Sequence, residues 1–498
     1  MAIAQGVYKQ LIVKQQSGLG LLDTQPASGG RFMRRVTSTI DLAKETYKSN
    51  EILPSQQHRD MRHGVRSVAG TISGELSGQT YQPFMGGILR KAFVSNQISD
   101  ASTNTMIARA TSDNTGTFTD ASATFVTDGW YVGMVVRFTG WAVHTAYGTA
   151  TNATTSTSYS IGATSIVTSS CNGTIIAGDA IRFGSDTTDY IVSAVSGSTS
   201  AWTLTISALL SNVGSGATIT IQTNASTLNN GHNFLITGLT ETVMTVRSLD
   251  NVAISSKNCV IDNQVDVTLS ACIGKYSYIP SSGHIENYYT IEHSYTDIDQ
   301  SEVFTDCVPS QMNIKLPATG MATIDFPIIG LDMDVYSGSS APFHTSPTSI
   351  TTGGIYASVN GALYVNGSSV ATITNMDISI NGNVASMGGV VGTNVAPDIQ
   401  FGTVEVTGSM SIFFENATIR NYFLNETEVA LMVTLTTSSS SNADFMSIYM
   451  PRVKLGGATK DDGQKGLVMT VPFTALENTT AGSGIILSTI MIHDSLAA

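Results

Sequence analysis

Alternation of apolar and polar residues at period two dominates the hydrophobic pattern of this chain. Between positions 68 and 76, Val68, Ile72 and Leu76 share one face, and small or polar residues share the other. Such alternation is typical of a strand with one buried face. The same reasoning predicts further strands at 31–41, 288–295, 304–316, 322–331, 429–436, 451–455 and 468–476.

Residues 80–93 change to the helical period. Their apolar side chains fall on one face of a helix: Tyr81, Phe84, Met85, Ile88, Leu89 and Phe93. Gly86 and Gly87 weaken this helix by about 1 kcal/mol each relative to alanine. A shorter pattern at 419–423 predicts a second helix. We therefore expect a mainly β protein with two flanking helices.

One part of the chain repeats another. Residues 37–93 and 375–431 align without a gap at a constant offset of 338 (375 − 37). The strands that follow run in parallel, with 314–316 matched to 453–455 and Pro327 to Pro472. A β-rich module carried twice supplies quasi-equivalent surfaces for rings and arrays. We expect two fused β-sandwich or barrel modules, each with one flanking helix.

A long excursion interrupts the first copy only. Two runs inside it share the pattern Gly-x-x-[Val/Ile]-Arg-Phe, starting at Gly133 and Gly178, which predicts one small β-barrel nested in a loop of another. Such an insertion costs little, because loop-closure entropy grows only logarithmically with length. The predicted parts are an N-terminal arm (1–30), a discontinuous first module (31–111 and 256–335), an inserted outer β-domain (112–255) with a nested β-domain (142–227), and a second module (336–498).

Composition excludes several classes of function. Only 12% of residues are charged, the net charge is −13, and no long basic run is present, which argues against a DNA-wrapping protein. The four cysteines, Cys171, Cys259, Cys272 and Cys307, lack a Cys-x-x-Cys spacing, so we interpret them as small buried residues. No apolar stretch approaches the about 18–20 residues of a membrane span, and we expect no signal peptide.

Catalytic motifs do not occur in the sequence. The chain has no Gly-x-Ser-x-Gly elbow, phosphate-binding loop, His-Glu-x-x-His or calcium-loop pattern. Asp332 and Asp334 are spaced as a carboxylate pair, but they lead into Ser-Gly, where turn chemistry is the commoner explanation. We therefore expect neither an enzyme nor a cofactor.

Charged residues concentrate in the predicted loop 44–66. A structureless loop of about 20 residues is uncommon in a compact domain and is usually functional or disordered. Mixed charges fix register at an interface, so we interpret the loop as an inter-subunit contact; the alternative is a solvated loop. Its candidate residues are Lys44, Glu45, Tyr47, Lys48, Glu51, His58, Arg59, Asp60, Arg62, His63 and Arg66.

The loop at 380–402 keeps the same length in the second copy but carries few charges. Its candidate residues are Asn383, Met387, Asp398, Gln400 and Phe401. If both loops contact neighbours, they use different chemistry.

Two blocks of sequence resemble the tail tube proteins of long-tailed, non-contractile bacteriophages. The first block contains Ser38-Thr39-Ile40-Asp41-Leu42, Arg59-Asp60-Met61-Arg62-His63-Gly64 and Val68-Ala69-Gly70-Thr71-Ile72. The second contains Val406-Thr407-Gly408-Ser409, Pro451-Arg452-Val453-Lys454 and Val471-Pro472-Phe473. The resemblance covers about residues 1–111 and 256–498. The excursion is similar to the accessory β-domains that such tubes carry on their outside.

The resemblance implies a structural virion protein. Such proteins close into rings that stack into a hollow tail, and two-module members form trimeric rings with pseudo-sixfold symmetry. Loop 44–66 would then contact the next ring. The implied partners are further copies of the chain, the tape measure, tail tip and terminator proteins, and DNA that passes without specific binding. The acidic balance fits a lumen that repels phosphates. The implied location is the phage tail, after assembly in the host cytoplasm and without a membrane.

Two other classes of protein stay open at this stage. A virion adhesin would bind host surface glycans through the inserted β-domains, with Trp130, Trp141 and Trp202 as binding aromatics rather than barrel core. A polysaccharide-degrading tail enzyme would need two carboxylates about 5–10 Å apart, and no such pair can be nominated. Deleting 112–255 separates tube from adhesin, because a tube subunit would still polymerise.

Overall fold

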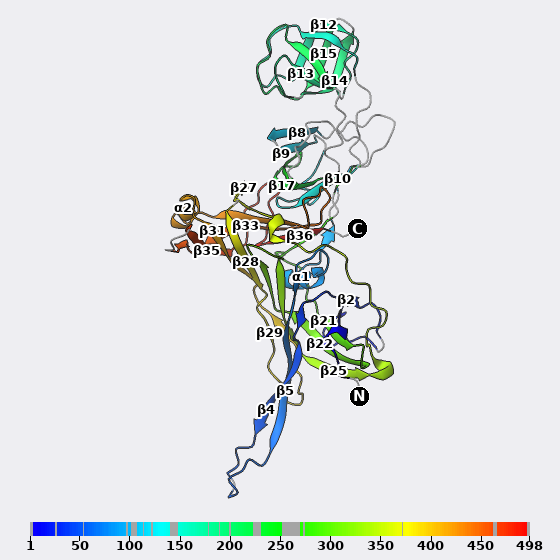
Figure 1. The fold of residues 1–498 in the computed structure, drawn as a ribbon, viewed down its shortest axis with the longest axis vertical. Coiled ribbons are helices and arrows are strands. Elements are labelled where there is room, and N and C mark those ends of the chain that lie inside the picture. The colour runs from blue at the N-terminus through cyan, green and yellow to red at the C-terminus, as the bar shows by residue number, and fades with distance from the viewer. Residues whose placement is uncertain are drawn as a thin grey trace.

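Antiparallel strands make up most of the computed structural model. Among the residues that the structure describes, two short α-helices accompany them, α1 (Gln82–Leu89) and α2 (Thr418–Leu424), with three 3-10 turns at Gly6–Tyr8, Gly338–Ser340 and Ser358–Asn360. Figure 1 shows a small barrel at one end, a long hairpin projecting from the other end, and the body of sheets between them. The structure describes residues 3–24, 27–52, 54–95, 98–100, 107–112, 114–120, 123–139, 148–177, 179–188, 190–198, 201–222, 231–250, 269–271, 274–370, 372–461 and 466–495.

One run of strands, which we call the spanning sheet, connects both halves of the body. Its order is β4–β5–β24–β23–β28–β31–β35–β34, and every neighbouring pair is antiparallel. The halves meet at the β23–β28 ladder. The bounds are β3 (Thr37–Ser38), β4 (Asp41–Lys48), β5 (Met61–Glu75), β23 (Gln311–Leu316), β24 (Thr323–Gly330), β28 (Ile373–Asn381), β31 (Glu405–Phe413), β34 (Thr459–Lys460) and β35 (Val468–Ala475).

Two outer layers cover the apolar face of the spanning sheet. The first-half layer contains β2 (Arg31–Phe32), β1 (Lys9–Gln15), β21 (Tyr289–Tyr295), β22 (Gln300–Pro309) and β25 (Asp332–Ser337), in that order. The second-half layer contains β27 (Ser368–Ser369), β26 (Gly361–Val365), β32 (Val429–Thr436), β33 (Phe445–Leu455), β36 (Met491–Ser495), β20 (Gly274–Tyr278) and β6 (Val94–Ser95). One hydrophobic core runs between these layers and the sheet, through both halves.

The pairing pattern recurs in the two halves. β24 pairs with β5 and β35 with β31, and a proline occupies the same rung in each ladder: Pro327 opposite Thr71, and Pro472 opposite Ser409. The outer hairpins β21–β22 and β32–β33 both shift register at the matching rung. β22 and β33 each pair, in addition, with one strand of the spanning sheet, β24 and β35 respectively.

Glycines at matching positions of β5 and β31 allow close backbone approach. A Cβ on Gly70 would lie 2.4 Å from Ile40 Cα, and a Cβ on Gly408 would lie 2.3 Å from the Asp377 carbonyl oxygen. A real side chain cannot come so near to backbone atoms, so only glycine fits at either position. The two glycines are 338 residues apart (408 − 70), the offset of the sequence repeat.

Four expectations about local elements are wrong. Residues 1–30 are not wholly an arm, since β1 is a layer strand; its Leu11-Ile12-Val13 run is buried on both faces and therefore does not alternate. The predicted strand 304–316 belongs to two strands, β22 and β23. The predicted loop 44–66 is mostly hairpin, because β4 and β5 extend into it. The expected match of 314–316 to 453–455 is also wrong. By their pairing partners, β33 of the second half corresponds to β22 of the first, and β34 corresponds to β23, whereas 314–316 lie in β23 and 453–455 lie in β33.

The excursion forms a seven-stranded sheet and a closed barrel. The insertion sheet contains β7 (Ile98–Asp100), β19 (Leu269–Ala271), β10 (Val135–Thr139), β17 (Asn233–Leu239), β18 (Val243–Ser248), β9 (Thr115–Thr119) and β8 (Ile107–Ser112). The barrel contains β11 (Thr151–Thr155), β12 (Ser165–Asn172), β15 (Ala201–Ile206), β14 (Tyr190–Ser198), β13 (Ala180–Phe183) and β16 (Thr218–Gln222). The predicted boundary at 111 falls inside β8, and the boundary at 256 lies outside the described residues.

The insertion sheet packs on the second half, although it interrupts the sequence of the first. Its core includes Phe118, Trp130 and Phe234 together with Met432 and Tyr449 of the second-half layer. The flanking strands β6 and β20 extend that layer beyond β36. An excursion from one half therefore covers and extends the other.

The tryptophans and cysteines fall mainly in hydrophobic interiors. Trp130 is fully buried and Trp202 is half-buried against the barrel core, whereas Trp141 lies outside the described residues. Cys171 and Cys307 are buried free thiols; Cys259 and Cys272 lie outside the described residues.

Candidate assembly surface

The spanning sheet has one polar face. Along β24, the buried Ile324, Phe326 and Ile328 alternate with accessible Thr323 and Asp325. The same alternation holds on the neighbouring strands, because one face lies on the core and the other does not. The accessible side chains, which define the polar face, include Thr71, Ser73, Gln311, Asn313, Ser379, Asn381, Thr407, Ser409, Ser411, Thr470 and Thr474.

Carboxylates predominate among the charges of the polar face. The acidic positions are Asp41, Glu75, Asp325, Asp377 and Glu405. Lys315 lies opposite Asp377 in the β23–β28 ladder, and its Nζ is 3.0 Å from Asp325 Oδ2. The hydrogen bond to Asp325 raises the pKa of Lys315. At the margin, Lys454 Nζ is 4.0 Å from Glu428 Oε1. Carboxylates repel the negative charges of a phosphate backbone.

Two edges of the spanning sheet are open within the described residues. β3 and β4 pair only with β5 at one end, and β34 pairs only with β35 at the other. An open edge presents unpaired N–H and C=O groups, which another strand can use. Each of these edges therefore leaves backbone groups to which another strand could bind.

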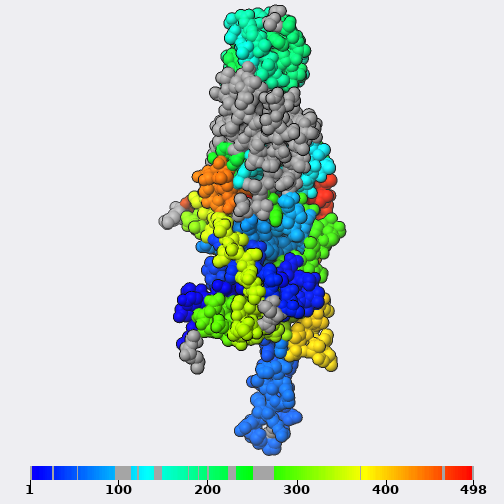
Figure 2. Space-filling view, turned by 90° about the vertical axis from the view of Figure 1, so that its right-hand side faces the viewer, coloured from blue at the N-terminus to red at the C-terminus, as the bar shows by residue number. Residues whose placement is uncertain are grey.

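The candidate residues of the first loop lie on a hairpin that projects from the body (Figure 2). We call β4, β5 and their connection 49–60 the charged hairpin. The positions on β4 are Lys44, Glu45, Tyr47 and Lys48; those in the connection are Glu51, His58, Arg59 and Asp60; those on β5 are Arg62, His63 and Arg66. The structure thus brings all of them onto one protrusion, with seven on the two paired strands and four in the connection.

Local contacts hold parts of the charged hairpin. Tyr47 donates a hydrogen bond to Glu45, which raises the pKa of the tyrosine. Arg62 Nε lies 2.9 Å from Asp60 Oδ2, in a pair that is largely exposed. Arg66, at the base, donates to both oxygens of Asp332 at 2.7 and 2.9 Å. Exposed ion pairs contribute only about 0–1 kcal/mol each, so Arg62 is able to exchange its partner.

Large apolar side chains on the charged hairpin face solvent. Tyr47 is 55% exposed, Ile52 is 99% exposed and Met61 is 50% exposed. Tyr47 was among the residues expected from the sequence, whereas Ile52 and Met61 were not, because the expectation rested on charged side chains. Apolar groups flanked by charges are the usual composition of a contact surface.

The candidate residues of the second loop lie on a shorter hairpin that folds back onto its own chain. This second hairpin comprises β29 (Val384–Ser386), β30 (Ile399–Phe401) and their connection 387–398. Asn383 donates to the Thr403 carbonyl at 2.6 Å, and the Met387 N–H donates to the Asp398 carbonyl at 2.9 Å. Gln400 is exposed on β30.

Residues of the second hairpin contact the first half of the chain. Asp398 accepts a hydrogen bond from the Tyr288 hydroxyl at 3.3 Å, and the Phe401 ring packs edge-on against Tyr288 with 6.0 Å between centroids. The Arg66 N–H donates to the Asn394 carbonyl at 2.7 Å, at the base of the charged hairpin. Burial, with Asp398 nearby, raises the pKa of Tyr288 to about 12. The second hairpin is thus an internal clamp, and it is not equivalent to the first.

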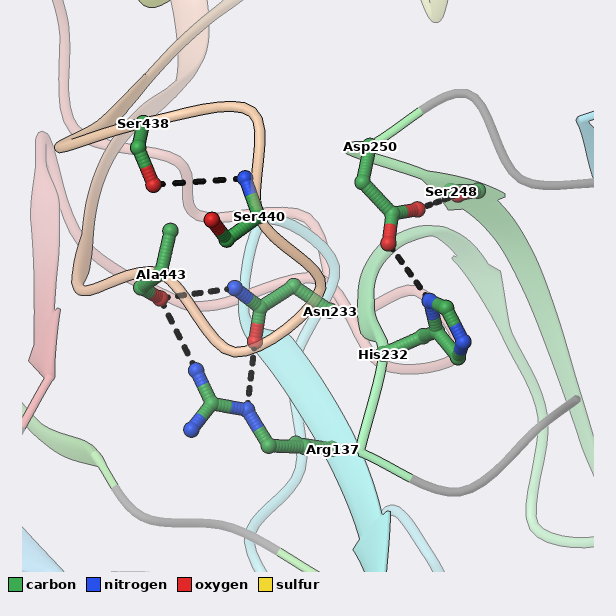
Figure 3. A network of polar contacts seen from close by, with 8 residues as sticks. All are labelled: Arg137, His232, Asn233, Ser248, Asp250, Ser438, Ser440 and Ala443. Atoms are coloured by element: carbon green, nitrogen blue, oxygen red, sulfur yellow. Dashed lines mark hydrogen bonds and ion pairs between the residues drawn. The ribbon is translucent and has the colours of Figure 1, made fainter. Parts of the chain in front are cut away.

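Polar contacts fasten the insertion to the second half (Figure 3). Arg137 of β10 donates from Nε to Asn233 Oδ1 at 2.7 Å and from a terminal nitrogen to the Ala443 carbonyl at 2.8 Å. Asn233 Nδ2 donates to the same carbonyl at 2.8 Å. Nearby, His232 contacts Asp250, which also accepts from Ser248. The Arg137 guanidinium and the Asn233 side-chain amide both donate to the Ala443 carbonyl. These two hydrogen bonds hold the β32–β33 connection against the insertion.

Two neighbouring residues of β36 join three parts of the molecule. His493 Nδ1 accepts a hydrogen bond from the Val135 N–H of the insertion at 3.0 Å, and burial lowers its pKa to about 3. Asp494 accepts from Gln79 N–H at 2.8 Å and from Gln82 Nε2 at 2.7 Å, at the start of α1. Burial raises the pKa of Asp494 to about 7.

Within the described ranges, no group of three or more His, Cys, Asp or Glu side chains is placed to hold a metal ion. Among the helices of the described part of the chain, none is long and apolar enough to cross a membrane. The chemistry of the described surface lies in the polar face, its open edges and the charged hairpin.

Comparison with known proteins gives one family. Residues 230–475, just under half of the 498-residue chain, match the model of a family described as phage tail tube protein. No curated protein matches the chain. The matched range begins at β17 and includes β21–β35, so it spans the β23–β28 junction and most of the polar face. It differs from the range of the sequence resemblance, since it omits residues 1–111 and includes part of the insertion sheet. The match supports a structural role in a phage tail tube.

Proposed function

We propose that this chain is the subunit of a tail tube, in which copies close into a ring and rings stack into a hollow tail. The polar face of the spanning sheet would line the channel. The observation that carries this proposal is the spanning sheet itself, with an acidic hydroxyl-rich face and two open edges, inside a chain that matches a tail tube family.

The face has the chemistry that a DNA channel requires. DNA must slide without sticking, and clustered cations would hold its phosphates by releasing counterions. Carboxylates at Asp41, Glu75, Asp377 and Glu405 instead repel phosphates, and Lys315 is already paired with Asp325. The proposed channel therefore passes DNA without binding it.

Each chain would contribute two modules to the ring. The recurring ladders, the matching prolines and the matching glycines support two modules of one origin. Heterologous contacts of this kind close when the rotation between neighbours divides a full turn. Three chains would then give a ring with pseudo-sixfold symmetry, in the tail of a long-tailed, non-contractile phage. Its further partners would be the tape measure, tail tip and terminator proteins.

The charged hairpin would contact the next ring. Its outer part, residues 44–66, carries Lys44, Lys48, Arg59, Arg62 and Arg66 against Glu45, Glu51 and Asp60, so this part is locally basic on a chain of net charge −13. Opposite potentials on facing surfaces steer association and set register. Exposed Tyr47, Ile52 and Met61 supply apolar area to the same contact.

Reversing two charges of the hairpin tests the stacking contact. Arg59→Glu with Arg62→Glu should leave the fold and single rings intact but prevent tubes, measured by electron microscopy and sedimentation. Arg59→Lys with Arg62→Lys is the matched control and should keep tubes, because the charge is retained. Normal tubes from the double glutamate variant would contradict the stacking role of the hairpin.

A further inference from the structure

We propose that residues 457–461 of one copy pair antiparallel with residues 39–43 of a second copy, with Lys460 opposite Ile40. This pairing continues the spanning sheet from one chain to the next. It rests on the proposed function, and it adds the partner strand and the register. The open edges at β34 and β3–β4 are the two surfaces involved.

The internal junction supplies the template. β23 and β28 pair without a register shift from Gln311 opposite Asn381 to Leu316 opposite Met376, which places Ile314 opposite Ile378. This ladder joins the C-terminal edge of the first half to the N-terminal edge of the second. The edges of the whole chain are the same two kinds of edge, so the same ladder can form between copies.

The ladders with shared neighbours fix the register. Ile378 lies opposite Gly408 in the second half. In the first half Asp41 lies opposite Ala69, which places Ile40 opposite Gly70. Because Gly70 and Gly408 are matching positions, Ile40 is the counterpart of Ile378. On the other edge, Asn313 lies opposite Asp325 of β24, and Thr459 lies opposite Thr470 of β35. Because Pro327 and Pro472 occupy matching positions, Thr470 is the counterpart of Asp325. Their partners Thr459 and Asn313 therefore correspond, and the next residue, Lys460, is the counterpart of Ile314.

Backbone directions agree with this register. The Asp461 N–H donates to the Val468 carbonyl on β35, so by alternation the N–H groups of Ala458 and Lys460 point to the open side. On the other edge, the Thr39 N–H donates to the Thr71 carbonyl on β5, so the groups of Ile40 and Leu42 point outward. The outward groups are those that the proposed register brings together.

Apolar residues near the open edges are only half covered, whereas their counterparts near the internal junction are fully buried. The half-buried residues are Leu42, Phe414, Ile419, Tyr422 and Ala458. Their counterparts are, in the same order, Ile380, Leu76, Tyr81, Phe84 and Met312. Apolar residues near both open edges of the spanning sheet thus lack the cover that the neighbouring module provides at the internal junction. A second copy in the proposed register would supply it.

The two junctions differ in their charges. Lys315 opposite Asp377 has no counterpart between copies, where Asp461 would lie opposite Thr39 and Asp41 opposite Thr459. Lys460 stands where the internal junction has Ile314, and its Nζ lies 4.1 Å from the Phe414 ring centroid. The contact between copies therefore depends on backbone pairing and apolar cover rather than on an ion pair across the strands.

A disulfide tests the register directly. Asp41 and Thr459 would form a non-hydrogen-bonded pair, whose Cβ atoms are about 4.5–5.5 Å apart, close to the separation that a disulfide needs. Asp41→Cys with Thr459→Cys should give covalent oligomers of assembled rings on a non-reducing gel. Ala43→Cys with Thr459→Cys is the control, because these positions are a diagonal pair too far apart to bridge. The single substitutions control for the four natural cysteines.

The outcomes separate the register from the function. Rings linked through 41 and 459 alone support the register, and rings linked only through 43 and 459 overturn it. Rings that link through neither pair overturn the edge contact while the tube function stands. An unmodified chain that forms no rings contradicts the proposed function itself. Hydrogen exchange on the unmodified protein provides a check without mutation: segments 39–43 and 457–461 should gain protection on assembly, and unchanged exchange would overturn the pairing.

Discussion

Truncating Phe84 to alanine should cost the unassembled chain about 3–5 kcal/mol of unfolding free energy. Phe84 of α1 is fully buried, and its ring packs edge-on against Tyr289 and Phe326, with centroid distances of 5.2 and 5.4 Å. Burying such a side chain contributes about 1.5–3 kcal/mol, and each ring pair adds about 0.5–1.5 kcal/mol. The helix lies where the two halves meet, so the cavity left by the truncated side chain would lie within the core that both halves share.

Tyr422 of α2 is the matched control, since it lies 338 residues later (422 − 84) and is only half-buried. Tyr422→Ala should cost the free chain about 1 kcal/mol, because no neighbouring module covers it. Urea unfolding of the unassembled protein, followed by circular dichroism, gives both values. A Phe84→Ala loss below about 1 kcal/mol, or an equal loss in both variants, would refute the reasoning from burial.

Two further predictions follow from the buried polar groups and the insertion. The raised pKa of Asp494, about 7, means that the native state holds this proton more tightly than the unfolded chain, so its stabilising contribution is lost as pH rises from about 4 to 7. Asp494→Asn lacks this loss, so its melting temperature relative to the unmodified protein should rise between pH 5 and pH 8; a constant or falling difference would contradict the assignment. The lowered pKa of His493 makes its contribution to stability increase as pH rises, but His493 is present in both proteins, so this contribution cancels in the difference between their melting temperatures. Replacing 140–230 with a short Gly-Ser turn should keep both fold and tube, because Arg137 and Asn233 are already paired and the barrel has its own core. Loss of ring formation in that variant, seen by electron microscopy, would show that the barrel takes part in assembly.

The sequence predicts most strands whose two faces differ. The strand at 468–476 appears as β35, because its buried and accessible residues alternate. The strand at 429–436 and the helix at 80–93 appear as β32 and α1, although β32 is buried on both faces. β1 was missed because both of its faces are covered, so Leu11-Ile12-Val13 has no alternation to detect. When alternation at period two is the only signal used to identify strands, a strand of consecutive apolar residues is not detected, and the segment is interpreted as an extended arm.

The candidate site was predicted in part. Charge density located the hairpin residues, but not the exposed Ile52 and Met61, and not the polar face. Ser, Thr and Asn on alternate strand positions are visible in the sequence, yet only the β23–β28 ladder places both halves of that face in one sheet. The insertion shows the same limit: its interruption is evident from the repeat, whereas its packing on the second half depends on His493 and Tyr449, far away in sequence.

End-on electron microscopy of the purified, concentrated protein would show whether the chain forms tube rings. Hollow rings with three peripheral lobes are expected, because each chain carries one insertion and contributes two modules. Six lobes would keep the tube but contradict the two-module ring. Compact monomers, under conditions that include a tail-tip initiator, would contradict the tube function itself.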